Sequence, residues 1–149
     1  MKLENKKYLL DSNKEVQLNE LVGEKGLIMF FYPKAHTSGC ILEVQEYEKR
    51  NIEFKDLGFN IVGVSGDDVE NQNSFSCDYV LNYPLIADVN RELIANFNLE
   101  AETTTWENQT IKITKRNTYV LNKNLEVIKE FSDVDPVGHI NDVINFLKK

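Results

Sequence analysis

Cys40 is the residue of this chain whose type and position point most directly to chemistry. It follows an apolar run, residues 26–32, and a short polar loop, and it stands at the start of a predicted helix. The first turn of a helix carries unpaired backbone N–H groups and the positive end of the macrodipole, and both favour a thiolate over a thiol. Because the thiolate is the nucleophilic form, the sequence predicts sulfur chemistry at Cys40.

Cys77 is the only other cysteine, 37 positions further along the chain. No Cys-x-x-Cys pair occurs, which argues against a zinc knuckle and against a thioredoxin-type redox pair. A chain of 149 residues can bury a core without disulfide staples, so two distant cysteines indicate a reducing compartment with transient disulfides. We expect no metal site and no cofactor site.

The elements that position Cys40 follow from apolar periodicity. Residues 26–32 form a continuous apolar run bounded by glycine and proline, which predicts a central strand buried on both faces. A helical stripe on the same face as Cys40 then continues to residue 57: Val44, Tyr47, Phe54 and Leu57. We expect one helix over residues 38–57 with Cys40 on its core side, although Asn51 interrupts the stripe.

The rest of the chain alternates strands with helices. After a weakly predicted hairpin over residues 9–18, we expect strands at 59–64 and 84–87, each followed by a helix, then a strand hairpin and a final helix. These last elements cover residues 118–121, 126–131 and 136–147. This order predicts an α/β fold with a central mixed β-sheet flanked by helices.

Composition and charge restrict the partners. The net charge of −7 and the absence of a Lys/Arg cluster argue against nucleic acid and against an anionic membrane. No stretch approaches the roughly 20 apolar residues of a membrane span. We expect a single domain over residues 1–149 that is cytoplasmic and is a monomer or weak dimer.

The loop before Cys40 also carries a recognisable motif. The pattern Pro33-x-x-x-Thr37-x-x-Cys40 resembles the peroxidatic site of the peroxiredoxins. The longer pattern Phe-Tyr-Pro-Lys-x-x-x-x-Gly-Cys resembles the peroxiredoxin Q branch, also called bacterioferritin comigratory protein. Further segments are similar to that branch in order and spacing, namely residues 60–70, 83–88 and 116–121. The resemblance covers roughly residues 15–148 and implies a thioredoxin-like fold.

The resemblance implies roles for five residues. Cys40 would be the peroxidatic cysteine, which attacks a peroxide and becomes a sulfenic acid. Thr37 matches the threonine that bonds the peroxide oxygen, and Arg116 matches the arginine that contacts the sulfur and the peroxide. Pro33 would shield the thiolate because it has no N–H and a fixed φ, and Glu43 would orient Arg116. The helix start and the guanidinium would together help the thiol to ionise near neutral pH.

Recycling of the sulfenic acid is the step that the motif leaves open. Many peroxiredoxin Q proteins have a resolving cysteine five residues after the peroxidatic one, but Gln45 occupies that position here. Another subset of the branch places it on the helix that contains Cys77, which implies an intramolecular Cys40–Cys77 disulfide. This bond requires partial helix unwinding, which the polar tract 71–74 would make inexpensive. A lone helical cysteine is also often core filler.

These features predict a thiol-dependent peroxidase that reduces hydrogen peroxide and organic hydroperoxides and is recycled by thioredoxin or a similar reductant. Two alternatives stay open: a redox-sensing or binding protein on the same fold, and a one-cysteine peroxidase recycled by an external thiol. We expect His36 to be a surface loop residue and His139 a surface or helix-face residue, neither with a role in the chemistry.

Overall fold

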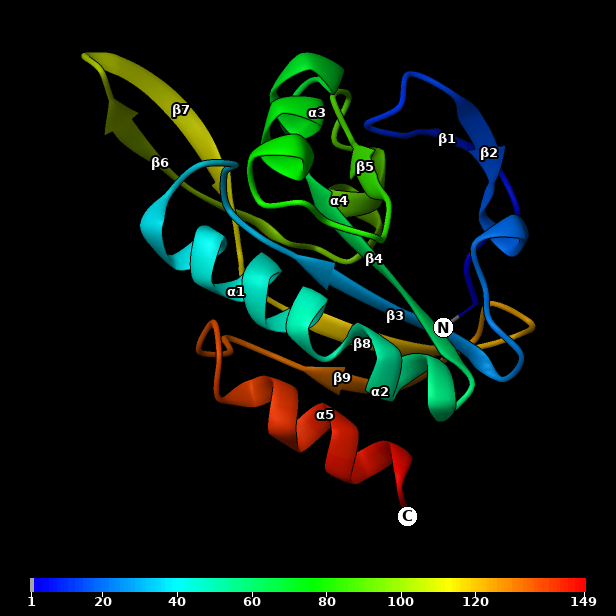
Figure 1. Ribbon diagram of the computed structural model, residues 1–149. Helices are drawn as coiled ribbons and strands as arrows, with labels where there is room; N and C mark the ends of the chain where they lie inside the picture. Colours follow the sequence, from blue (N-terminus) through cyan, green and yellow to red (C-terminus); the bar gives the residue numbers. More distant parts are fainter. Residues whose placement is uncertain (1) are drawn as a thin grey trace.

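A five-stranded mixed sheet forms the centre of the computed structural model, which describes the backbone of residues 2–149 and the side chains of residues 2–99, 107–108 and 114–149 (Figure 1). Its strand order is β5-β4-β3-β8-β9. The strands are β3 (Gly26–Phe31), β4 (Phe59–Ser65), β5 (Leu85–Ala87), β8 (Thr118–Asn122) and β9 (Val127–Phe131). β3, β4 and β5 are parallel, whereas β8 pairs antiparallel with both β3 and β9.

The central strand β3 is buried at every position, as predicted. Side chains alternate between the two faces of a strand, so Ile28 and Phe30 belong to one apolar core, while Leu27, Met29 and Phe31 belong to another. A strand covered on both faces must be apolar throughout, which explains why this segment shows no polar alternation.

Helices cover both faces of the sheet, and the predicted α/β architecture is confirmed. One core receives side chains from four helices: α1 (Ser38–Lys49), α2 (Asn51–Asp56), α3 (Val69–Asp78) and α5 (His139–Leu147). The other core lies under α4 (Glu92–Asn96), the hairpin of β1 (Lys7–Leu9) and β2 (Glu15–Gln17), and the 3-10 helix η1 (Leu18–Glu20). No helix in the described part of the chain is long and apolar enough to cross a bilayer.

Two predicted helices have different bounds in the structure. The single helix expected over residues 38–57 is divided at Arg50, whose backbone leaves helical geometry and whose side chain contacts Glu46, Glu53 and Asn141. The last helix begins at His139 rather than at residue 136, because the Asp135 carboxylate accepts a hydrogen bond from the Gly138 N–H and holds the preceding residues in a turn.

The hairpin of β6 (Glu100–Trp106) and β7 (Gln109–Thr114) was not predicted. It extends away from the central sheet in Figure 1. Its two-residue turn places Glu107 and Asn108 at φ values of 50° and 63°, the left-handed conformation that tight hairpin turns require. Asparagine is the signal for such a turn, but the first strand lacks the alternation of a half-buried sheet, and the second has it only at Ile111 and Ile113.

We predict that Phe30→Ala lowers the free energy of unfolding by about 3–5 kcal/mol, because Phe30 is fully buried and stacks on Tyr47 with ring centroids 4.2 Å apart. Urea denaturation measures this change. Ile52→Ala is the matched control, since Ile52 is 76% exposed, and it should change stability by less than about 0.5 kcal/mol. Equal effects of the two substitutions would contradict the core assignment.

Candidate active site

Cys40 is the third residue of α1 and is fully buried. The preceding loop delivers it from the end of β3, as the sequence predicted. Thr37 has the extended backbone of an N-cap residue, but its hydroxyl donates to the Lys34 carbonyl at 2.7 Å instead of capping the helix. Pro33 lies half-buried at the start of this loop. The tight turn between Lys34 and Thr37 therefore fixes the approach to Cys40.

Asp67 fastens the active-site loop to the rest of the protein. Its carboxylate accepts hydrogen bonds from the Ala35 N–H at 2.7 Å and the Ser65 hydroxyl at 2.6 Å, and it lies 3.6 Å from the Lys34 ammonium. The neighbouring Asp68 caps α3 through the Asn71 N–H. Of the two aspartates after β4, Asp68 thus caps the helix, while Asp67 holds the loop.

Arg116 reaches Cys40 because β8 begins where β3 ends. Phe30 pairs with Thr118, so the residue two positions before Thr118 lies beside the loop that follows β3. The guanidinium places Nη2 3.7 Å from the Cys40 Sγ, and Nη1 donates to Glu43 Oε1 at 2.7 Å. A Cβ on Gly39 would lie 2.9 Å from Nη2, so a glycine there leaves room for the guanidinium.

The environment of the Cys40 thiol contains opposing effects. Burial raises the pKa of Cys40 above its ordinary value, whereas the Thr37 hydroxyl, the Lys34 backbone and the Arg116 guanidinium act to lower it. The sequence had suggested that helix position and a guanidinium would bring the pKa down. Full burial outweighs them in the reduced protein, so the thiolate depends on the charges immediately around it.

Glu43 lies on α1 one turn after Cys40 and is also fully buried. Burial raises the pKa of its carboxyl to about 8 against the opposing effect of Arg116. Oε1 accepts from the guanidinium, but Oε2 has no hydrogen-bond partner among the described residues. A buried carboxylate oxygen without a partner is costly, so this group favours protonation.

The structure corrects the prediction that His139 is a surface residue. Its imidazole is buried, with Nε2 2.9 Å from the Tyr47 hydroxyl, 3.1 Å from the Thr118 hydroxyl and 3.7 Å from Glu43 Oε2. A sequence signal was present, because His139 lies four residues before Val143 on the apolar stripe of α5. The hydrophobic pattern concealed a polar side chain in the core.

Cys77 lies on the last turn of α3, exposed to solvent, and both cysteines are free thiols. The polar tract before Cys77, residues 71–74, is not uniformly easy to unwind. Gln72 is fully buried, accepts from the Tyr32 hydroxyl at 2.5 Å and donates to the Ile86 carbonyl at 2.8 Å. The expectation that the whole tract unwinds at little cost is therefore wrong. Unwinding is inexpensive only at the C-terminal end of α3, beyond the buried Phe75.

His36 connects the active-site loop to the same end of α3. Its ring lies 5.0 Å from that of Phe75, and its Nδ1 lies 3.9 Å from a carboxylate oxygen of Asp78. The side chain is 37% exposed, in keeping with the predicted surface position, and its contacts lie with α3.

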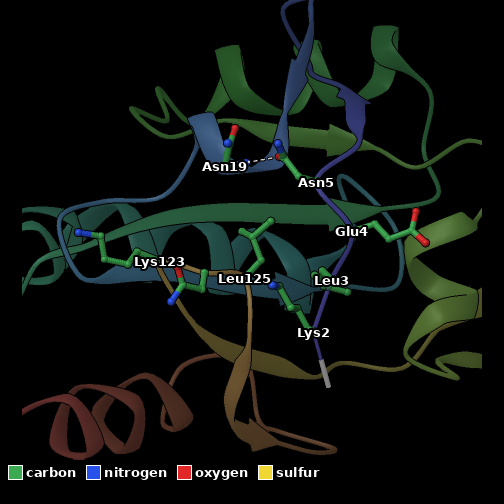
Figure 2. Close-up of a pocket in the computed structure, with 8 residues that line it drawn as sticks. Lys2, Leu3, Glu4, Asn5, Asn19, Lys123 and Leu125 are labelled. Carbon is green, nitrogen blue, oxygen red and sulfur yellow. Dashed lines mark hydrogen bonds between the residues drawn. The ribbon is translucent and has the colours of Figure 1, made fainter.

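The described residues offer no metal cluster at the site. Within the described part of the chain, no three His, Cys, Asp or Glu side chains are grouped so that they could hold a metal ion. The broad hollow shown in Figure 2 lies near the residues that follow β8, at the end of β3 opposite Cys40. Its polar lining comes from asparagines, lysines and Glu4, and it contains no nucleophile of the kind that Cys40 provides.

Comparison with known proteins identifies the family. A family model described as AhpC/TSA family matches residues 2–130. The chain belongs to this peroxiredoxin family. This peroxiredoxin is 30% identical over 122 residues to Peroxiredoxin Bcp of Xanthomonas campestris, a match that covers 82% of this chain and 76% of that protein. It is 28% identical over 138 residues to Peroxiredoxin Bcp of Bacillus subtilis, covering 93% and 87%.

Solved structures support the same assignment. The Xanthomonas campestris Bacterioferritin Comigratory Protein, solved in work on its alkyl peroxide reduction activity, matches this peroxiredoxin with a TM-score of 0.83 and 26% identity. The match covers 96% of this chain and 90% of that one. The predictions of a thioredoxin-like fold and of a peroxiredoxin enzyme are therefore confirmed.

We predict that Gly39→Ala slows the reaction of Cys40 with peroxide by about tenfold, or ~1.4 kcal/mol in the barrier, because the new methyl displaces the guanidinium from the sulfur. The single-turnover rate of sulfenic acid formation, trapped with dimedone and followed by mass spectrometry, measures the effect. Alanine favours a helix more than glycine does, so a lower rate would not reflect a weaker α1. Ser38→Ala, at the neighbouring exposed position, is the control.

Glu43 should make stability depend on pH. The pKa of Glu43 in the folded protein, about 8, exceeds the ordinary 4.5. Its contribution to the free energy of unfolding is therefore complete below pH 4.5 and is lost as pH rises through 8. The unfolding free energy of the wild type should therefore fall relative to that of Glu43→Gln across this window, by a few kcal/mol in order of magnitude. Urea denaturation of both proteins between pH 5 and pH 8.5 tests this. A difference that stays constant with pH would contradict it.

Proposed function

We propose that Cys40 is the peroxidatic thiol of a peroxidase that reduces hydrogen peroxide and organic hydroperoxides. The observation that carries the proposal is the position of Arg116, whose guanidinium donates toward the Cys40 Sγ and is held from behind by the buried Glu43 carboxyl. Such a cation can stabilise both the thiolate and the oxygen that leaves when a peroxide is cleaved.

The reaction follows from this arrangement. The Cys40 thiolate attacks one peroxide oxygen, an S–O bond forms and the O–O bond breaks. Cys40 becomes a sulfenic acid, and the leaving oxygen takes up a proton and departs as water or an alcohol. Sulfur is oxidised by two electrons and the peroxide is reduced by two. Arg116 faces the negative charge that develops on the leaving oxygen.

The loop before Cys40 supplies the remaining contacts. The Thr37 hydroxyl is one of the groups that lower the pKa of Cys40. It donates a hydrogen bond to the Lys34 carbonyl, and this bond fixes its position in the loop before the reacting sulfur. In our proposal it binds the peroxide oxygen, and the half-buried Pro33 shields the thiolate without offering a competing N–H. Anchoring by Asp67 keeps these groups in place before the substrate arrives.

Cys77 is the proposed resolving cysteine. Its thiolate would attack the sulfenic sulfur of Cys40, an S–S bond would form as the S–O bond breaks, and the leaving hydroxide would take up a proton from solvent and depart as water. The exposure of Cys77 and its position beyond the buried Phe75 support this role, because the last turn of α3 can unwind while Gln72 keeps the first turns in place. A thiol reductant such as thioredoxin, in a reducing cytoplasm, would then return both cysteines to thiols.

Serine substitutions separate the two cysteines. Cys40→Ser should abolish peroxide consumption, because the nucleophile is lost. Cys77→Ser should still form the sulfenic acid in a single turnover but lose turnover that depends on thioredoxin. Peroxide loss is followed with hydrogen peroxide and cumene hydroperoxide, and Ser76→Ala on the same turn serves as the matched control. Unchanged turnover in Cys40→Ser would overturn the proposal.

Mass mapping under non-reducing conditions tests the recycling step. After one equivalent of peroxide, a peptide that joins Cys40 to Cys77 is expected. If Cys77 stays free while Cys40 forms a mixed disulfide with added thiol, the protein is a one-cysteine peroxidase. If Cys40 reacts once and no reductant restores it, the protein is a redox sensor.

A further inference from the structure

Arg116, Glu43 and His139 form a continuous polar chain through an otherwise apolar core. Arg116 Nη1 binds Glu43 Oε1 at 2.7 Å, and Glu43 Oε2 lies 3.7 Å from His139 Nε2. Glu43 is 0% exposed and His139 is 2% exposed. His139 Nε2 is thus a basic atom close to the carboxylate oxygen that has no hydrogen bond.

The contacts of His139 determine where its proton resides. Nδ1 faces the Asp135 carbonyl oxygen at 2.5 Å, and because a carbonyl can only accept, Nδ1 carries a hydrogen. In the neutral ring Nε2 then accepts from the Tyr47 or Thr118 hydroxyl. A second proton can bind only at Nε2, which is the atom that faces Glu43.

The charged and titratable groups around this pair come from several elements. Burial raises the pKa of the Glu43 carboxyl and lowers the pKa of the His139 imidazole, so neither ionises easily alone. Burial also keeps the neighbouring phenols neutral, with pKa values well above the ordinary 10. In the described part of the chain, the groups that act on the pair are Cys40, Tyr47, Tyr83, Arg116, Asp135 and Asp142.

We propose that Glu43 and His139 together hold one proton behind Arg116, and that this proton sets how strongly the guanidinium stabilises the Cys40 thiolate. His139 is thus a positioning residue that acts on the sulfur through Glu43. The proposal rests on the proposed role of Cys40 and adds a residue for which the sequence motif gave no indication.

The charges of Cys40, Arg116 and the Glu43–His139 pair explain how the proton on the pair affects ionisation of the thiol. With the proton on the pair, either as carboxylic acid and imidazole or as carboxylate and imidazolium, the pair is neutral and the thiolate balances Arg116. When the pair has lost that proton, the carboxylate already balances Arg116, and a thiolate leaves one net negative charge buried. The thiol therefore loses its proton more easily while the pair keeps its own.

Solvent comes close to the pair on the side of His139, away from the Arg116 contact. A surface hollow between β9 and α5 is lined by His139, Asp135 and Asp142, together with residues of β9 and the turn that follows it. His139 thus connects this hollow to Glu43, which contacts Arg116. The imidazole itself is buried, but it lies next to this hollow, and in our proposal the pair equilibrates with bulk pH from this side.

The test is the midpoint of Cys40 ionisation, measured as the pH dependence of alkylation by iodoacetamide in a Cys77→Ser background. Glu43→Gln should lower the midpoint, because a neutral amide leaves Arg116 uncompensated. His139→Gln should raise it by about half a pH unit, because the pair then has one proton site instead of two and loses its proton more readily. In the Glu43→Gln background, His139→Gln should have no further effect.

One control and one further variant make the result decisive. His36→Gln removes the other imidazole of the chain, which contacts Phe75 and Asp78, and should leave the midpoint unchanged. Tyr47→Phe removes a donor to Nε2, strengthens proton binding by the pair and should lower the midpoint, which gives a second test if His139→Gln does not fold.

An unchanged midpoint in His139→Gln, or the same shift with and without Glu43, would overturn the proposal. If Cys40 shows the expected midpoints but does not react with peroxide, the proposed function fails and the proton pair stands.

Discussion

The contact between Arg116 and the buried Glu43 carboxyl is the interaction on which the site depends. A guanidinium beside a buried thiol must be held in position, since it would otherwise turn toward water. The bond from Nη1 to Oε1 at 2.7 Å provides that restraint, and the glycine at position 39 leaves the space that the other nitrogen occupies. The same carboxyl competes with the thiolate for the cation. The site is therefore a balance between two anionic groups that share one guanidinium, and their protonation states are linked.

The sheet makes this arrangement possible. Because β3 pairs antiparallel with β8, the end of one strand lies beside the beginning of the other, and the Phe31 N–H donates to the Asn117 carbonyl. The loop to α1 and the residue before that carbonyl thus meet at one edge of the core. Two segments that are 76 residues apart in the chain are joined by strand pairing, and short local features then set the final geometry. These features are the turn held by Lys34, the anchor at Asp67 and the first turn of α1.

Much of this was accessible from the sequence. Strand β3 was recognised because a strand buried on both faces is apolar throughout, and Cys40 lies in the first turn of a helix, as predicted. The division of the first helix at Arg50 and the burial of His139 were missed for a common reason. Helical periodicity records which positions are apolar, but a break in a helix and a polar side chain in a core are decided by contacts with distant residues, here Asn141 for Arg50 and Tyr47 for His139. Gln72 belongs to the same class, because its partners Tyr32 and Ile86 come from other elements.

The two cysteines lie in opposite environments, and this difference bears on how the cycle is completed. Cys40 is fully buried, which suits a reaction with a small peroxide but not attack by the thiol of a protein. Cys77 is exposed at the end of a helix whose first turns are fastened to the core. A disulfide between them would bring the oxidising equivalent from a site that only small molecules enter to a surface that a protein reductant can contact. In the proposed cycle the anchor at Gln72 would limit the unwinding of α3, and the helix would refold from its intact first turns once that disulfide was reduced.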